Sequence, residues 1–472
     1  MKKSARFMKA AGCILLWLSL AGCAYSDILD QVPRDFAYSA QAPQQEQDSA
    51  RDPQASQQGQ DSARDLQASQ QEQDSAMDSQ ASQQERNSAR DLQQAQGSAQ
   101  LPKQLSQSSA QEGLAPQGTG LGDSFLAEEA GDFACRALNG AEEVWYHEME
   151  EILGSFGEKV RLSEECLKAG LSEKDIDRIF QCVLNDHPEL FYVEGYSYSK
   201  YTKGSMLTAI VFSGTYGMDR ETAILRRQEI EQAAEQILAG ISADASDYDK
   251  VKYVYETLIA STDYELQSPD NQNIYSVLVN HRSVCQGYAK ATQYLLNRLG
   301  VECTLVLGTV ENGEGHAWNL VKVDGSYYYV DTTWGDASYQ LGETQASAGS
   351  AMPAINYDYL NITTRELLRT HTVRGVVPMP VCTAKEANYY VREGAWFEAF
   401  DSEGVRELFA RASAEGRTDV TVKCADVACY EEMTEALVTG QKIFDYWEDA
   451  GSHIAYAKNE NQLSLTFWVT NE

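Results

Sequence analysis

The sequence is poor in positive charge. Of its 472 residues, 38 are Lys or Arg and 70 are Asp or Glu, which gives a formal net charge of −32 at pH 7. Proteins that bind nucleic acid neutralise its phosphates with clustered Lys and Arg, so this balance excludes a nucleic-acid partner. A single hydrophobic core rarely grows beyond about 250 to 300 residues, and we therefore expect this chain to form several domains.

The N-terminus also lacks an apolar run long enough to span a bilayer. Residues 13–20 are apolar but too short for a span, and they follow the basic residues Lys2, Lys3, Arg6 and Lys9. We interpret residues 1–22 as a signal peptide. The stretch Leu20-Ala21-Gly22-Cys23 resembles a bacterial lipobox, which implies that Cys23 becomes a lipidated N-terminus at the extracellular face of the cell membrane. An ordinary signal peptide with a nearby cleavage site is the alternative.

Aromatic residues are absent between residues 41 and 100. Four copies of a DSAxDxQASQQxx pattern occur there with a period of 13, and they begin at Asp48, Asp61, Asp74 and Asn87. Such a composition offers too little apolar area to offset the chain entropy lost on folding. We expect residues 23–120 to form a disordered stalk that holds the folded part away from the membrane. A low-complexity repeat without a role is the alternative.

Residues 121–245 are predicted to form an α+β domain. Ser172 and Asp175 have the spacing of a capping box, and an apolar helical face follows over residues 176–184. Residues rich in Tyr, Val and Phe predict strands over 191–201 and 207–216, and a polar helix is expected over 220–239. His147 and His187 are isolated in this region, and we interpret them as structural or surface residues.

Residues 385–472 are predicted to form a small α/β module. Its expected strands cover 389–391, 396–400, 420–424, 454–456 and 463–469, and its expected helices cover 403–414 and 430–446. The module has no nucleophile beside a base, so a role in packing or in substrate recognition is expected. Cys424 and Cys429 could pair, although nothing in the sequence requires a disulfide.

The central residues, 246–380, hold a cysteine at the start of a predicted helix. After Cys285, apolar residues recur at helical spacing up to Leu299, and Gly300 is well placed as the C-terminal cap. The free amides and the dipole at a helix N-terminus favour a thiolate, which is the nucleophilic form of cysteine. Gly287 removes side-chain bulk at a point where a substrate backbone could approach.

A predicted hairpin places a base and a carboxylate on one face. Asp324-Gly325 is a strong two-residue turn signal between the apolar runs 316–323 and 326–333. If Val323 opposes Ser326, then His316 faces Thr333 and Trp318 faces Asp331. His316 and Asp331 then become diagonal neighbours, about 7 to 8 Å apart at the backbone and within reach of their side chains.

Acyl transfer needs a nucleophile, a base and a group that orients the base. The predicted helix supplies the thiol, and the predicted hairpin supplies the imidazole and the carboxylate. Taken alone, each residue has a simpler explanation, since most cysteines are small buried hydrophobes and most strand histidines are structural. The three together favour catalysis. No His or Cys cluster has the spacing of a metal site, and no cofactor is expected.

The motifs around these residues are Ser283-Val284-Cys285-Gln286-Gly287-Tyr288-Ala289, Gly315-His316-Ala317-Trp318-Asn319 and Tyr329-Val330-Asp331-Thr332-Thr333-Trp334. They resemble the motifs of the bacterial transglutaminase-like superfamily. The resemblance implies an α+β, papain-like core, in which the helix that bears the cysteine packs on an antiparallel sheet. It also implies that Cys285 is the nucleophile, His316 the base and Asp331 the orienting group.

Other residues have weaker assignments. Gln272 is a candidate oxyanion donor on the strength of the resemblance, and a loop glutamine without a role is the alternative. Trp318 could shield the ion pair from water or fill the core, and Trp334 is expected to pack. His281 is expected at the surface, and His371 is expected to be structural.

The resulting hypothesis is a surface-anchored thiol enzyme. It would catalyse acyl transfer or hydrolysis at amide bonds of proteins or peptides, among which cell-wall peptides are one candidate. The superfamily includes crosslinking enzymes, amidases and cysteine peptidases, and neither fold nor triad chooses among them. A non-catalytic adhesion or scaffold lipoprotein that uses the same fold for binding is the alternative.

Overall fold

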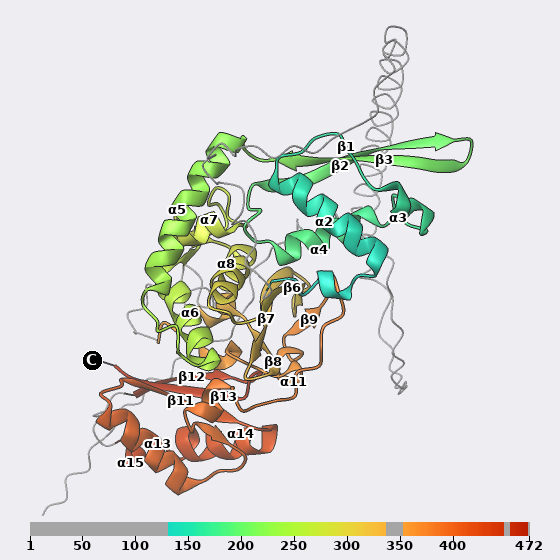
Figure 1. Cartoon of the computed structure of the whole chain (residues 1–472). Helices are drawn as coiled ribbons and strands as arrows, with labels where there is room; N and C mark the ends of the chain where they lie inside the picture. The colour runs from blue at the N-terminus through green and yellow to red at the C-terminus, as the bar shows by residue number, and fades with distance from the viewer. Residues whose placement is uncertain (1–130, 337–352, 448–453, 471–472) are drawn as a thin grey trace, which may run out of the picture. The chain divides into compact units, whose positions relative to one another are not determined.

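The computed structural model describes residues 131–336, 353–447 and 454–470 (Figure 1). The expected signal peptide, the lipidated Cys23 and the repeat stalk lie outside the described residues. Within the described ranges, no helix is both long and apolar enough to cross a membrane.

The N-terminal region combines helices with a small antiparallel sheet. Its elements are η2 (Cys135–Ala137), α2 (Gly140–Gly154), β1 (Val160–Arg161), α3 (Glu164–Lys168), α4 (Ile176–Asp186), β2 (Val193–Lys203), β3 (Met206–Tyr216) and α5 (Arg220–Leu238). The strands lie in the order β1-β3-β2. The predicted strand pair and polar helix are confirmed. Ser172 donates its backbone N–H to Asp175, but α4 begins only at Ile176, so the box precedes the helix rather than capping it.

The central region has the expected helix on an antiparallel sheet. It contains α6 (Asp247–Ser261), β4 (Asp263–Tyr264), α7 (Ile274–Leu278), β5 (Arg282–Ser283), α8 (Cys285–Arg298), β6 (Cys303–Val310), β7 (Gly315–Val323), β8 (Ser326–Val330), α9 (Thr332–Gly335), η3 (Tyr357–Tyr359), α11 (Thr364–Leu367) and β9 (His371–Val373). The main sheet has the order β8-β7-β6-β9, and every pair in it is antiparallel. Helix α8 packs against β6 and β7 (Figure 1), with Ala289 buried against Leu305 and Ala317.

One hydrophobic core runs through the N-terminal and central regions. Its buried residues extend from Ala134 to Ala387 and include side chains of α2, α4, α6 and α8. Polar contacts reinforce this core at the end of α4. Asn185 donates its side-chain N–H to Thr304 on β6 over 2.8 Å, and Gln293 on α8 donates to the Asn185 carbonyl over 2.8 Å. The N-terminal region thus helps to fix the helix that begins at Cys285.

The hairpin turn forms as predicted, but the second strand is shorter. Val323 opposes Ser326, and both turn residues have positive φ, 49° at Asp324 and 82° at Gly325, which fits a two-residue turn. The expected pairing of His316 with Thr333 and of Trp318 with Asp331 is wrong, because β8 ends at Val330 and the chain enters α9. His316 pairs instead with Gly308 on β6.

The C-terminal module has its own core and a sheet of order β10-β11-β13-β12. Its elements are α12 (Tyr389–Arg392), β10 (Trp396–Phe397), α13 (Ser402–Ala414), β11 (Asp419–Cys424), α14 (Val427–Thr434), the π-helix η4 (Glu435–Thr439), α15 (Ile443–Tyr446), β12 (Ile454–Asn459) and β13 (Ser464–Val469). The pair β10 and β11 is parallel, and the other two pairs are antiparallel.

Two expectations for this module are wrong, and the possible pairing of Cys424 with Cys429 does not form. The strand expected at 389–391 is α12, because the Asn388 side chain accepts the Tyr390 N–H and caps a helix. The helix expected over 430–446 is interrupted after the π-helix, where Gln441 has a φ of 56°. Cys424 and Cys429 are free rather than paired.

Candidate active site

Cys285 is the first residue of α8. Eight cysteines lie in the described ranges, all free, and Cys285 is the only one of these eight that is not buried. Its N-cap, Val284, has no side chain that could occupy the helix amides. The amides at the start of α8 thus remain available to a thiolate or to an oxyanion that forms beside it.

A loop is fastened against the start of α8. The Asn271 carbonyl accepts the backbone N–H of Val284 over 3.1 Å and the Ser283 hydroxyl over 2.7 Å. The Ser283 and Ser276 hydroxyls are 2.7 Å apart. Gln272 is the next residue of this loop and is half-buried, so the predicted oxyanion donor belongs to the segment that adjoins Cys285. Its role as a donor stays a prediction.

Gly287 has a packing role that differs from the expected one. A Cβ at this position would lie 1.9 Å from Ser283 Oγ and 3.1 Å from the Asn271 carbonyl oxygen. The space is therefore filled by the loop itself rather than left open to a substrate backbone. Glycine at 287 lets α8 approach the loop closely, which is how the loop and the thiol come together.

His316 and Asp331 form the predicted pair. His316 Nε2 lies 2.7 Å from Asp331 Oδ2, and both side chains are buried. Asp331 reaches this position as the N-cap of α9, where its Oδ1 accepts the Trp334 N–H over 3.0 Å. The two residues thus meet at the end of a strand and the start of a helix, and not across the ladder that the sequence predicted.

The electrostatics of the pair favour charge separation. Burial opposes a charged imidazole, but the Asp331 carboxylate and a hydrogen bond with Cys285 outweigh it and raise the pKa of His316 to about 10. Burial would also raise the pKa of Asp331, but His316 and His371 hold that pKa well below its usual range. An imidazolium beside an ionised carboxylate is the state that stabilises a neighbouring thiolate.

A second histidine, which the sequence interpretation set aside as structural, contacts the same carboxylate. His371 Nε2 lies 3.0 Å from Asp331 Oδ2, and the His371 side chain is fully buried. His371 is the first residue of β9, which pairs with β6 at Val310. It stands 40 residues beyond Asp331, so no local pattern in the sequence connects the two.

Aromatic rings enclose the three polar groups. The Trp318 ring lies 5.9 Å from the His316 ring and nearly parallel to it, at 24°. Trp334 lies 4.7 Å and Tyr359 lies 5.7 Å from the His371 ring. These rings exclude water, which strengthens the interaction between charges inside the enclosure. The Trp318 and Trp334 rings both contact the His316 ring, and the role of Trp318 at the site stays a prediction.

His316, Asp331 and His371 could also offer ligands to a metal ion, since their ligand atoms all lie within 4.8 Å of one another. However, the Nε2 atoms of His316 and His371 both already lie at hydrogen-bonding distance from Asp331 Oδ2. This arrangement satisfies the carboxylate and both rings without a cation. The geometry is that of one carboxylate held between two imidazoles.

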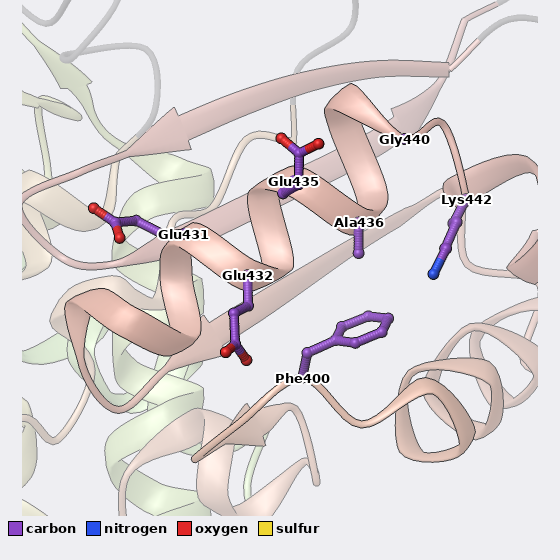
Figure 2. Close-up of a pocket in the computed structure, with 7 residues that line it drawn as sticks. All are labelled: Phe400, Glu431, Glu432, Glu435, Ala436, Gly440 and Lys442. Atoms are coloured by element: carbon purple, nitrogen blue, oxygen red, sulfur yellow. The ribbon is translucent and has the colours of Figure 1, made fainter.

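A separate pocket of about 660 Å³ lies in the C-terminal module and is lined by Phe400, Glu431, Glu432, Glu435, Ala436, Gly440 and Lys442 (Figure 2). Lys442 Nζ lies 5.3 Å from the centre of the Phe400 ring. The lining residues include no Cys, Ser or His. Thiol chemistry of the kind described above therefore has no place in this pocket.

Comparison with known proteins found a similarity in the central part of the chain. Residues 231–332 match the family model of the transglutaminase-like superfamily. The match includes Cys285, His316 and Asp331 and ends before His371. Residues 231–332 are therefore similar to the transglutaminase-like superfamily, and they lie in a mixed α and β region in which α8 packs on the sheet.

Two curated relatives are the kyphoscoliosis peptidases of Mus musculus and Homo sapiens, which are 26% and 27% identical to this chain over 106 residues. The matches cover 19% of this chain, and they span only 16% of the length of either relative.

Two solved structures show partial likeness. A TGase structure has 18% sequence identity and a TM-score of 0.22, and the match covers 29% of this chain and 45% of the other. A Cytophaga hutchinsonii protein assigned to the cysteine proteases has 12% identity and a TM-score of 0.20, with 30% and 66% covered.

Proposed function

We propose that the protein is a thiol enzyme that transfers or hydrolyses acyl groups at amide bonds of proteins or peptides. The observation that supports this most strongly is the 2.7 Å contact between His316 and Asp331, with Cys285 at the helix start beside them. Nucleophile, base and orienting carboxylate then stand in the order that acyl transfer requires.

The reaction follows from these positions. The Cys285 thiolate attacks the amide carbonyl carbon, and the negative charge moves to the carbonyl oxygen, near the free amides of α8. When the carbon–nitrogen bond breaks, His316 gives its proton to the leaving amine, and a thioester on Cys285 remains. His316 then accepts a proton from water or from a lysine amine, and this acceptor attacks the thioester. The carbon–sulfur bond breaks, and the Cys285 thiolate and the His316 imidazolium return.

The acceptor defines the type of enzyme. Attack by water gives a peptidase or an amidase, and attack by a lysine amine gives a protein crosslinking enzyme. With Cys23 lipidated and residues 23–120 as a stalk, the domain would act on substrates at the extracellular face of the membrane. Both the anchor and the location belong to this proposal.

Thiol alkylation and turnover test the proposal together. Full-length protein is treated with iodoacetamide across pH, and the modified site is located by peptide mass spectrometry. Because the other described cysteines are buried, label should appear at Cys285 first. Turnover is measured as ammonia released from glutamine peptides, as cleavage of casein, and as incorporation of a fluorescent amine into casein.

Matched variants complete the test. Cys285→Ala and His316→Ala should abolish turnover. His281→Ala is the control, because His281 is exposed and lies only four residues before Cys285 in the sequence. If Cys285 alkylates no faster than a free thiol, or if Cys285→Ala keeps its turnover, the protein is a scaffold rather than an enzyme.

A further inference from the structure

We infer that His371 is a positioning residue of the reaction: its Nε2–H holds Asp331 in the orientation that His316 requires. The inference rests on the proposed function and extends it from three side chains to four. It begins from one carboxylate oxygen, Asp331 Oδ2, which lies 2.7 Å from His316 Nε2 and 3.0 Å from His371 Nε2. Both contacts are within hydrogen-bonding distance.

Both oxygens of the Asp331 carboxylate have hydrogen-bond donors. Oδ1 accepts the Trp334 N–H, and Oδ2 accepts from both histidines. A buried carboxylate that accepts three hydrogen bonds stays ionised and cannot rotate without breaking at least one of them. Without His371, the oxygen that faces His316 would keep only that histidine as a partner.

The surroundings of His371 fix which nitrogen carries its proton. Nε2 must carry it, because the ionised Asp331 can only accept. Nδ1 must then accept, and the Thr370 hydroxyl lies 2.8 Å from it as the donor. The Tyr359 hydroxyl lies 3.5 Å from the same Thr370 oxygen and can donate to it. The Leu367 carbonyl lies 3.5 Å from the same Thr370 oxygen and is a second acceptor for its proton. With its proton on Nε2 and Nδ1 accepting from Thr370, His371 is neutral.

The charges that face His371 agree with a neutral ring. Asp331 faces the His371 ring from the start of α9 and contacts it directly. His316 faces it from β7 and contacts the same carboxylate oxygen. Burial lowers the pKa of His371 and outweighs the carboxylate. His316 carries the mobile proton, whereas His371 keeps its own proton through the cycle.

A packing role makes a different prediction from a positioning role. The rings of Trp318 and Trp334 lie 4.9 Å and 4.7 Å from the His371 ring, so an apolar aromatic side chain would fit the enclosure equally well. His371→Phe keeps a ring there but removes the donor. His371→Gln loses the ring but can place an amide N–H where Nε2 stands. If His371 only packs, the Phe variant should have the higher kcat. If His371 positions Asp331, the Gln variant should have the higher kcat.

The test compares these variants in the full-length protein. In His371→Phe, kcat should fall about 10- to 100-fold, the size of loss seen when outer hydrogen-bond partners of metal-binding residues are removed, and KM should stay unchanged. His371→Gln should recover most of kcat. The acid limb of the Cys285 alkylation profile should move to higher pH in His371→Phe, because a carboxylate with fewer donors takes up a proton more readily. His147→Phe, on the exposed face of α2, is the control substitution.

Wild-type kcat and an unshifted alkylation profile in His371→Phe would overturn the inference, as would a Gln variant weaker than the Phe variant. Failure of the proposed function looks different, because wild-type Cys285 would then alkylate as an ordinary thiol.

A measurement on the wild-type chain needs no variant to fold. In ¹⁵N-histidine NMR, His371 should be neutral with its proton on Nε2. A charged ring, or a proton on Nδ1, would refute the positioning role whether or not turnover is found.

Discussion

The backbone N–H of Asp331 donates to the carbonyl oxygen of Tyr359 over 3.0 Å. This bond fixes the main chain at the point where β8 gives way to α9, and it joins the backbone of Asp331 to η3. The next residue back in η3, Asp358, accepts from Lys423 Nζ on β11 over 3.3 Å. The C-terminal module therefore holds the segment on which Asp331 rests.

The ion pair between Lys423 and Asp358 is buried, so the stability of the fold should depend strongly on it. The Lys423 side chain has no exposed surface, and its Nζ also lies 3.4 Å from Gln462 Oε1 and 3.9 Å from Glu366 Oε1. Lys423→Met leaves Asp358 without its cation, so we expect a loss of about 3 to 5 kcal/mol in the free energy of unfolding. Urea denaturation measures it. Lys442→Met, at an exposed lysine of the same module, is the control, and an equal loss in both variants would contradict the prediction.

The pKa of His316 predicts how stability and charge depend on pH. The fold raises this pKa from its usual 6.5 to about 10, so the folded state binds the proton more tightly than the unfolded state does. The stability that His316 contributes is complete below about 6.5 and is lost as the pH rises through about 10. The difference in unfolding free energy between wild type and His316→Gln should therefore shrink between pH 7 and pH 10.

The titration itself can be followed by NMR at the ring Cε1–H of His316. Its midpoint should lie near 10 in wild type. It should fall in Asp331→Asn, which removes the negative charge while keeping a similar shape. A wild-type midpoint near 6.5 would show that the imidazolium is not held by Asp331.

Gly287 offers a test of how the thiol is positioned. An added methyl group would meet Ser283 Oγ at 1.9 Å, and that hydroxyl is itself held by the Asn271 carbonyl. We expect Gly287→Ala to lower stability by about 1 to 3 kcal/mol, as overpacking does, and to slow the alkylation of Cys285. Gly140→Ala is the control, since nothing lies within 4 Å of a Cβ there.

A second substitution separates the clash from other effects of alanine. Ser283→Ala removes the colliding oxygen, so the double variant should recover part of the stability that Gly287→Ala loses. Equal stability in the double and the single variant would show that the clash is not the cause. Thermal unfolding and urea denaturation both measure the difference.

The sequence predicted the parts of the site that depend on local chemistry. Asp324-Gly325 specified the hairpin turn, and helical spacing after Cys285 specified α8. From these two elements, the meeting of His316 with Asp331 could be predicted, although through a longer strand than the chain forms. The turn into α9 depends on a cap by Asp331 and on a bond to Tyr359, and neither contact has a signal in the hairpin itself.

The missed features depend on contacts between distant residues. His371 joins the site only because β9 pairs with β6, and a strand of three residues leaves almost no pattern in the sequence. The sequence predicts a strand over residues 389–391, which include Tyr389. In the structure it stacks on Tyr357 at 3.8 Å in a short capped helix, so tertiary packing overrides its intrinsic preference.

The N-terminal and central regions share one core, and this limits which segment of the chain recombination could transfer to another protein as a folded unit. The residues that match the superfamily, 231–332, exclude α4, yet the end of α4 is hydrogen-bonded to both α8 and β6. Transfer of the matched segment alone would strip these bonds and expose core side chains of α8. The span that can be inherited as a working unit therefore extends at least from Ala134 to Ala387, the ends of the common core.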